Sequence, residues 1–290
     1  MRAIGDYRRA VDYLRRNLPL LTGELACETL GLAGLASVLT RGHLAWSLAE
    51  LGEFGEARQH AEEALRLAQG ADHPYSLAHA HLAMGGTLLR QGWFSEAMGM
   101  LERGLELCRN VPFLYPPIAA DLAIVYAFSG RTSAAVELAH EAVTRGEKGG
   151  RLGRLSLIVS HLSEVCHLAG QSQAAATRAA WALELARERG ELGNQVYALR
   201  LSGQLAAERE PPDVESAKRN FGEALDLAER LSMRPLLARC HLGLGRLHRR
   251  FGETGAAEHH LTAASRLFED MGMTFWLGRL ALDRVAPLLI

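Results

Sequence analysis

The stretches LTRGHLAWSLAELG (residues 39–52) and EARQHAEEALRLAQ (residues 56–69) place apolar side chains three and four positions apart and contain no proline. This spacing is typical of amphipathic α-helices, because 3.6 residues per turn bring such positions onto one face. Only a short joint that contains Gly52 separates the two stretches. We therefore expect two consecutive helices connected by a tight turn.

The same pattern recurs along the chain, with a loop residue followed by an alanine and then by a second small residue. The marker residues are Gly5, Gly52, Gly92, Gly130, Gly170, Glu210 and Gly252, so one copy has glutamate in place of glycine. After a first interval of 47 residues, the marker returns every 38 to 42 residues. A period of this length predicts a helical solenoid and not a globular catalytic domain.

Proline positions mark the boundaries between the expected helix pairs, because proline inside a helix costs about 3 kcal/mol and at a first turn costs little. We expect pairs at 35–69, 74–109, 114–147, 151–189, 191–231 and 233–271. Residues 1–22 form a half repeat and residues 273–290 a capping helix without a mate. The whole chain, 1–290, is expected to form one α-solenoid domain.

A small residue lies seven positions before each loop marker, on the first helix of every pair. These residues are Ala45, Gly85, Ala123, Ser163, Gly203 and Gly245. The marker alanines of the second helices, such as Ala57 and Ala97, face them, and a bulky neighbour such as Leu44 or Met84 flanks the position. This arrangement predicts close helix packing of the ridge-into-groove type.

Small residue, loop glycine, alanine and second alanine follow one another in the order of the tetratricopeptide repeat, which the chain resembles over nearly its whole length. The resemblance implies an all-α, right-handed superhelical solenoid whose first helices line a concave binding face. The last repeat, from Cys240 to Leu277, is similar to the C-terminal repeats of bacterial signalling proteins. In those proteins a class III adenylate/guanylate cyclase-like domain and an ATPase domain precede the repeats, and related arrays occur in regulators similar to the maltose activator family.

The N-terminus begins with half a repeat, since residues 5–10 enter a second helix that no first helix precedes. A repeat cut in this way is expected to expose an apolar face. Upstream residues of a longer protein, a partner, or a second copy in a homodimer would cover that face.

Composition narrows the function classes. The chain is 48% hydrophobic with a formal net charge of −1, and it has no uninterrupted apolar run long enough to span a membrane. The start lacks the apolar run of a secretory signal and the four cysteines form no CxxC pair, so we expect a cytoplasmic protein. Near-neutral charge offers no general attraction to phosphate, so direct nucleic-acid binding is not expected.

No catalytic motif stands out. The only lysines, Lys148 and Lys218, do not fit a phosphate-binding loop, which needs glycine before the lysine and serine or threonine after it. Histidine spacings such as His161 to His167 differ from the i, i+4 pair of helical zinc sites. We therefore expect no enzyme activity, no metal and no cofactor, although an enzyme or nucleotide-binding protein stays as the third interpretation.

The concave positions that the family resemblance assigns differ between the two halves. The first three pairs contribute apolar positions such as Trp46, Leu82 and Ile124, and the last three contribute polar and basic ones. The candidate ligand-binding residues are Glu164, His167, Tyr197, Arg200, Gln204, Arg239, Arg246 and Arg249. Arginine forks suit an acidic peptide, a carboxylate terminus or a nucleotide-like anion. The alternative is a solvated helix surface on which these arginines pair with neighbouring glutamates.

Two binding functions stay open. In the first, the solenoid is the sensory or scaffolding arm of a larger cytoplasmic signalling protein and binds a protein or peptide. In the second, it is a free-standing adaptor that binds an acidic peptide or associates with itself.

Overall fold

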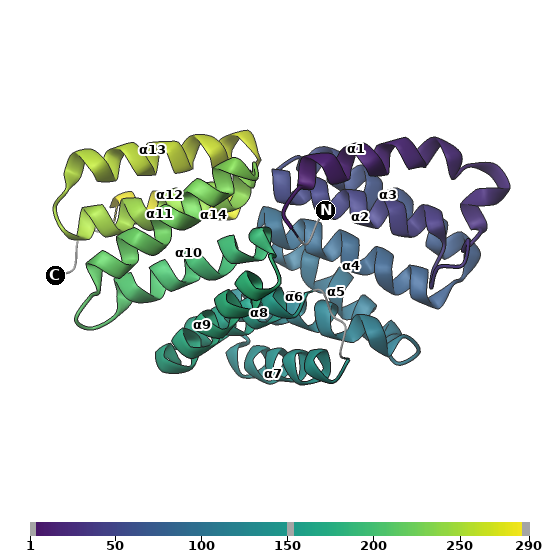
Figure 1. Cartoon of the computed structure of the whole chain (residues 1–290), viewed down its shortest axis with the longest axis horizontal. Coiled ribbons are helices and arrows are strands. Elements are labelled where there is room, and N and C mark those ends of the chain that lie inside the picture. Colours follow the sequence, from purple (N-terminus) through teal and green to yellow (C-terminus); the bar gives the residue numbers. More distant parts are fainter. Residues whose placement is uncertain (1–3, 150–153, 286–290) are drawn as a thin grey trace.

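The computed structural model describes residues 4–149 and 154–285, and within them the chain forms fourteen α-helices and no β-strand (Figure 1). The first helix is α1 (Tyr7–Asn17) and the last is α14 (Thr274–Val285). Between them lie six antiparallel pairs: α2 (Ala36–Leu51) with α3 (Phe54–Ala71), α4 (Pro74–Gln91) with α5 (Phe94–Leu107), α6 (Tyr115–Phe128) with α7 (Thr132–Lys148), α8 (Leu155–Leu168) with α9 (Ser172–Glu188), α10 (Leu192–Glu208) with α11 (Val214–Arg230), and α12 (Arg234–Arg250) with α13 (Thr254–Asp270).

The predicted fold class, a helical solenoid of six pairs with a half repeat and a terminal helix, is confirmed. The ends of the predicted elements at 1–3, 151–153 and 286–290 lie outside the described residues. Helix α2 ends at Gly52, whose φ of 83° is left-handed and whose N–H bonds to the carbonyl of Ala49. Such a conformation favours glycine, which explains why the marker glycine recurs at the turn inside the pairs.

The seam between the two helices of each pair is complementary in size. Where the first helix carries glycine, the second carries a large side chain: a β-carbon on Gly85 would lie 2.5 Å from Leu101, and one on Gly245 would lie 2.6 Å from Leu261. Where the first helix carries alanine or serine, the equivalent position of the second helix is a buried alanine. These alanines are Ala61, Ala139 and Ala179. Large side chains of the seam therefore lie opposite glycine, where there is no side chain to meet them.

Phe221 of α11 shows how tightly the seam is filled. Its ring is buried, and a β-carbon on Gly203 would lie 2.8 Å from it. A β-carbon on Gly243, on α12 of the next repeat, would lie still closer to the tip of the same ring. One phenylalanine thus connects two successive repeats, because both neighbours lack a side chain.

The superhelix winds far enough for its C-terminal half to contact its N-terminal half. Tyr7 of α1 is only 4% exposed, and its hydroxyl lies against Gly193 at the start of α10. Arg8 Nε donates to Ser232 Oγ at 3.0 Å. The apolar face of the half repeat was predicted to be exposed, and this prediction is wrong for Tyr7, Ala10 and Val11, which are buried inside the chain. The physical reason is that α1 packs on α2, while the curvature of the solenoid brings the start of α10 and the residues after α11 against the start of α1.

Helix α14 adds a second connection between the halves. Its Phe275 meets Phe94 of α5 edge to face at 4.7 Å between ring centroids. Just before α14, the carbonyl of Met271 accepts a hydrogen bond from Gln91 Nε2 at 3.4 Å. The terminal helix therefore covers α13 and also reaches across to the N-terminal half.

Candidate ligand-binding channel

Three small cavities follow one another through the interior of the superhelix, between the first helices of the pairs. The N-terminal cavity, of about 20 Å³, lies between Trp46 and His161. The central cavity, of about 40 Å³, shares His161 with it and extends to Trp276. The arginine cavity, of about 130 Å³, shares Trp276 with the central one. Shared walls make the three cavities one interrupted channel along the concave face.

The arginine cavity is strongly basic. Five arginines and two glutamates line it, together with His167 and Gln204 among the polar groups: Arg200, Arg239, Arg246, Arg250, Arg279, Glu164 and Glu208. Its apolar wall includes Phe128 and Trp276. Six of the eight candidate residues named from the sequence meet here, and Tyr197 lines the central cavity instead. Arg249 lines none of the three cavities.

Two arginines share one carboxylate oxygen at the floor of this cavity. Arg200 Nη2 lies 3.0 Å from Glu164 Oε1, and the Nη2 of Arg239 bonds to that same oxygen. Arg200 is 3% exposed, and its Nε has no hydrogen-bond partner. A buried guanidinium with a free N–H is costly, so the cluster lacks one acceptor.

The charges in this cluster shift the pKa values of its members. Burial alone would raise the pKa of Glu164, but Arg200 and Arg239 outweigh burial and hold it at about 2. The pKa of Arg200 is lowered, first by burial and then by repulsion from Arg239. The cluster is therefore an excess of buried positive charge.

Polar contacts continue from this floor towards the rim. Arg200 Nη1 donates to Gln204 Oε1 at 2.9 Å. Gln204 Nε2 lies 3.0 Å from His167 Nε2 and donates to Glu208 Oε1 at 3.1 Å. Side chains in this row hold one another in place, so the floor is preorganised for a group that accepts hydrogen bonds.

Rim arginines have different partners. Arg246 Nε donates to Asp283 Oδ2 of α14 at 2.7 Å, and Arg249 donates to the carbonyl of Asp283. Arg250 Nη1 donates to the carbonyl of Ala207 at 2.7 Å. Arg279 is exposed and makes no ion pair with any residue that the structure describes. The alternative interpretation, a solvated surface on which the arginines pair with acidic side chains, thus holds in part. Arginines do pair with acidic groups, but the pair of Arg200 with Glu164 is buried and not solvated.

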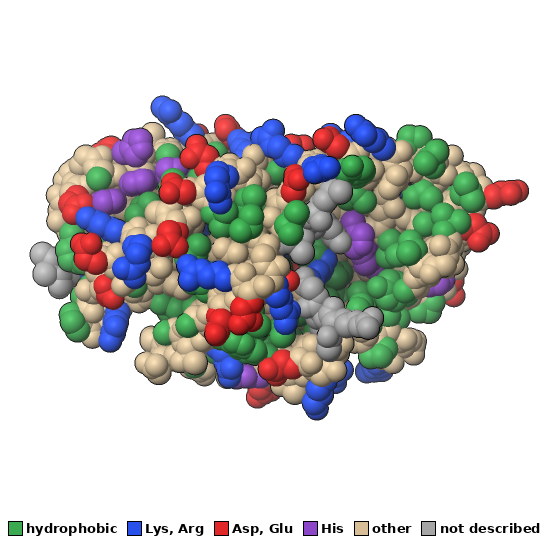
Figure 2. All heavy atoms as spheres, viewed as in Figure 1, with side chains coloured by type: hydrophobic (Ala, Val, Ile, Leu, Met, Phe, Trp, Pro, Cys, Tyr) green, Lys and Arg blue, Asp and Glu red, His purple; other side chains and the backbone are tan. Residues whose placement is uncertain are grey.

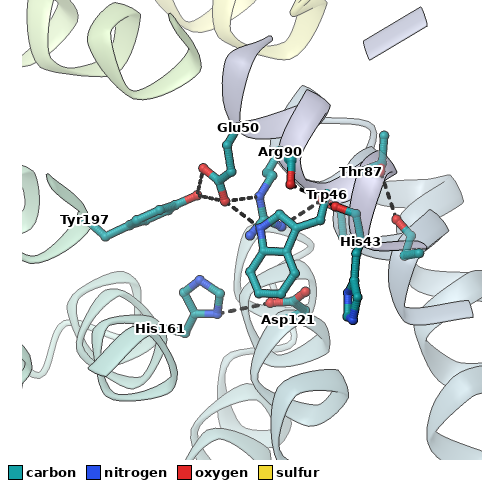
Figure 3. A network of polar contacts seen from close by, with 11 residues as sticks. His43, Trp46, Glu50, Thr87, Arg90, Asp121, His161 and Tyr197 are labelled. Atoms are coloured by element: carbon teal, nitrogen blue, oxygen red, sulfur yellow. Dashed lines mark hydrogen bonds and ion pairs between the residues drawn. The ribbon is translucent and has the colours of Figure 1, made fainter. Parts of the chain in front are cut away.

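The N-terminal half of the channel is polar, whereas the sequence predicted it to be apolar. Glu50 of α2 accepts hydrogen bonds from Trp46 Nε1 at 2.8 Å, from Arg90 Nε at 2.7 Å and from Tyr197 Oη at 2.9 Å (Figure 3). Burial, opposed by the positive charge of Arg90, raises the pKa of Tyr197. Because Tyr197 belongs to α10, this network joins the two halves of the molecule across the channel.

A contact between a histidine and a carboxylate lies beside this network. His161 Nδ1 is 3.3 Å from Asp121 Oδ1, and both side chains are buried (Figure 3). Burial opposes ionisation of Asp121, but the contact with His161 outweighs it and lowers its pKa. Since Arg90 also lines the N-terminal cavity, its wall carries charge of both signs.

The concave positions assigned from the sequence did not include a further stripe of inward-facing residues. Each residue of this stripe follows directly after one of the assigned positions on a first helix. Glu50 follows Ala49, Arg90 follows Leu89, and Asp121 follows Ala120. The stripe continues through the other first helices with Phe128, Leu168, Glu208 and Arg250, all of which line the channel. The sequence did contain a signal for this stripe, because charged residues recur at the same position of otherwise apolar first helices. The inner face of a curved solenoid is wide enough to include this further position on each helix.

Other site types were sought in the same structure. Histidines gather over α12 and α13 (Figure 2), and His241 Nδ1 lies 2.8 Å from His260 Nδ1. Among the residues that the structure describes, no group of three or more His, Cys, Asp or Glu side chains has the geometry to hold a metal ion. In residues 4–149 and 154–285, no helix combines the length and apolar character needed to cross a membrane.

Comparisons with known proteins agree with this geometry. The family model of the tetratricopeptide repeat matches residues 38–75, which hold most of α2 and all of α3. No curated protein sequence gives a significant match.

Several solved structures share the fold. The apo form of RapI is 11% identical, covers 90% of this chain and 90% of its own, and has a TM-score of 0.63. A Rap protein complexed with competence and sporulation factor is 11% identical over 92% of this chain and 71% of its own, with a TM-score of 0.70. The Rap conjugation gene regulator of plasmid pLS20, in complex with a Phr peptide, is 17% identical over 92% and 70%, with a TM-score of 0.68. At these identities the likeness establishes a tetratricopeptide-like solenoid fold.

Proposed function

We propose that this chain is a non-catalytic module that binds a peptide in its interior channel, with an acidic group of the peptide in the arginine cavity. The observation that carries the proposal is the pair of guanidiniums, buried Arg200 and half-buried Arg239, on one oxygen of Glu164, with Arg200 Nε lacking an acceptor. A carboxylate entering this cavity supplies that acceptor and balances the charge. Charge-assisted bonds of this kind are about twice as strong as neutral ones.

The fold supports a peptide as the ligand. Solenoids of this type expose extended concave surfaces, and the Rap regulator of plasmid pLS20 was solved with a Phr peptide bound. In the present chain the channel runs past six first helices, and its inner walls combine aromatic, apolar and charged groups. An extended peptide can use all of these, whereas a small anion needs only the floor.

We place this module, by its sequence resemblance, in a larger cytoplasmic signalling protein as a sensory or scaffolding arm. A cyclase-like or ATPase domain is the output that the resemblance suggests. A free-standing adaptor is the second candidate. The mass of the native gene product distinguishes the two, since an adaptor is expected at 31.6 kDa and an arm far above it.

The test uses two fluorescein-labelled peptides, pentaglutamate and pentaglutamine, with fluorescence anisotropy as the measurement. We expect the full chain to bind pentaglutamate and to lose at least tenfold in affinity in the variant Arg239→Gln. This substitution leaves Arg200 and Glu164 as a balanced pair, so the fold is retained while the excess charge is removed. Arg187→Gln is the matched control, because Arg187 lies on α9 and pairs at the surface with Glu223.

Two results would overturn the proposal. Equal binding of the two peptides would mean that charge is not recognised. Unchanged pentaglutamate binding in Arg239→Gln would place the acidic site elsewhere.

A further inference from the structure

Helix α14 fills part of the channel with aromatic side chains. Phe275 meets Phe94 at 4.7 Å and Phe128 at 5.7 Å between ring centroids. Trp276 meets Phe128 edge to face at 5.7 Å and is 8% exposed. The opposing wall has no side chain at Gly92, so the indole packs directly against its backbone: a β-carbon there would lie 3.2 Å from Trp276 Nε1. An aromatic notch, made by Gly92, Phe94 and Phe128, thus receives two rings from α14.

Trp276 stands between the central cavity and the arginine cavity and lines both. The guanidinium carbon of Arg239 lies 4.4 Å from its ring centroid. One of the two floor arginines is therefore engaged on one side by Glu164 and on another by an aromatic face, which attracts the cation. A ligand that follows the channel past this point has to displace the indole.

The same helix places an acidic side chain at the rim. Asp283 accepts from Arg246 at 2.7 Å, and its backbone carbonyl accepts from Arg249. Trp276 and Asp283 are seven residues apart, so both lie on the inner face of α14. The helix thus offers the channel an aromatic group and a carboxylate together.

We infer that α14 is an internal competitor for the channel, and that the ligand it competes with is an acidic peptide that carries an aromatic residue. Such a ligand replaces the contacts of α14 group for group, with its ring in the aromatic notch and its carboxylate on the arginines. This inference rests on the proposed function. It adds the class of side chain that accompanies the acid and the means by which the channel is closed when empty.

The geometry makes displacement feasible. The outer face of α14 is open to solvent at Leu282, which is 67% exposed. Exchange of one set of aromatic and ionic contacts for an equivalent set changes the free energy little, so the equilibrium between docked and displaced α14 responds to ligand concentration. Loss of the docked helix also removes the contacts of Phe275 that connect the two halves of the superhelix.

The first test uses α14 as its own probe. A fluorescein-labelled peptide with the sequence of residues 273–283 is added to the full chain and to the double variant Phe275→Ala, Trp276→Ala. We expect the double variant to bind this peptide at least tenfold more tightly than the wild-type chain, because its own helix no longer occupies the notch. Leu282→Ala is the matched control on the same helix and is expected to behave as wild type.

The result that overturns the inference is equal affinity of the wild-type chain and a folded double variant for this peptide. Circular dichroism establishes the helix content of each variant. A peptide in which the phenylalanine and tryptophan are replaced by alanine shows whether binding depends on the rings.

A reversible lock tests the same idea without relying on the double variant. A β-carbon at Gly92 would lie 3.3 Å from Cβ of Phe275, which is shorter than the roughly 3.5–4.5 Å of a disulfide, so a small outward shift of α14 brings the two positions to bonding geometry. The variant Gly92→Cys, Phe275→Cys, with the exposed Cys27 changed to serine, holds α14 in place when oxidised and releases it when reduced. Both forms share any strain at position 92, so their comparison isolates the position of the helix.

Tryptophanyl-pentaglutamate, labelled with fluorescein, is the probe for the locked variant. We expect binding in the reduced form and a loss of at least tenfold on oxidation. Equal binding by both forms would overturn the competition by α14 while leaving the proposed function intact. Absence of binding by both forms, and by the wild-type chain at any peptide concentration tested, would reject the proposed function. The α14 peptide then still decides whether the helix docks as a competitor.

Discussion

The seam inside each helix pair and the channel inside the superhelix are both buried, yet they are built in opposite ways. The seam is apolar and periodic, and Gly85 with Leu101 has the same role as Gly203 with Phe221. The channel is polar and differs from repeat to repeat, with Glu50 and Arg90 at one end and Glu164 with Arg200 at the other. A repeated size pattern, with large side chains opposite glycine, is sufficient to stack the helices. Specific charges connect the two halves across the channel and are available to recognise a ligand.

The largest expected effect breaks the seam. Phe221→Ala removes the ring that fills the space beside Gly203 and Gly243, and it is expected to lower the free energy of unfolding by about 4 kcal/mol. Urea denaturation followed by circular dichroism measures it. The control Phe113→Ala, at a residue that is 57% exposed, is expected to change stability by less than about 0.5 kcal/mol. A small loss for Phe221→Ala would show that the repeats can repack around a cavity.

The next effect breaks the channel. Glu164→Gln leaves buried Arg200 and half-buried Arg239 without a carboxylate, and we expect a loss of about 3 kcal/mol. Addition of pentaglutamate is expected to restore more stability to this variant than to the wild-type chain, because the ligand then supplies the missing charge. Thermal unfolding with and without the peptide measures the difference. A variant as stable as wild type would mean that the cluster is not strained by its excess charge.

The smallest effect concerns the last helix pair, α12 with α13, where His241 and His260 contact each other between the two helices. Burial, together with His241, His248 and His259, lowers the pKa of His260 from 6.5 to about 4. The unfolded chain therefore binds a proton that the folded chain does not between pH 6.5 and pH 4, so stability falls as the pH falls through this window. His260→Gln is expected to flatten this part of the pH profile of the melting temperature. An identical profile for wild type and variant would contradict the assignment.

Much of the fold was predictable because its determinants are local. The marker glycine at position 52 has the left-handed φ that a tight turn requires, and small residues such as Gly85 lie where helices approach. The candidate residues on α8, α10 and α12 could also be named, because a helical period carries them onto one face. Their role in binding stays a prediction until peptides are measured.

The rest could not be read from the sequence because it depends on curvature. Tyr197 and Glu50 are 147 positions apart and meet only after the solenoid has turned back on itself. Gln91 and Met271 meet in the same way. Small differences in packing angle accumulate over the repeats, so no local pattern tells whether the two halves touch.

The sequence by itself determined the number of helix pairs and the small residues at which paired helices approach, since both follow from side-chain size and helical period within one repeat. Only the tertiary structure decided that the start of α1 meets the start of α10, that Glu50 closes the channel with Tyr197, and that α14 places Trp276 beside Arg239. The physical reason is that neighbour contacts build a solenoid, whereas its interior is formed by residues that the accumulated turn brings together.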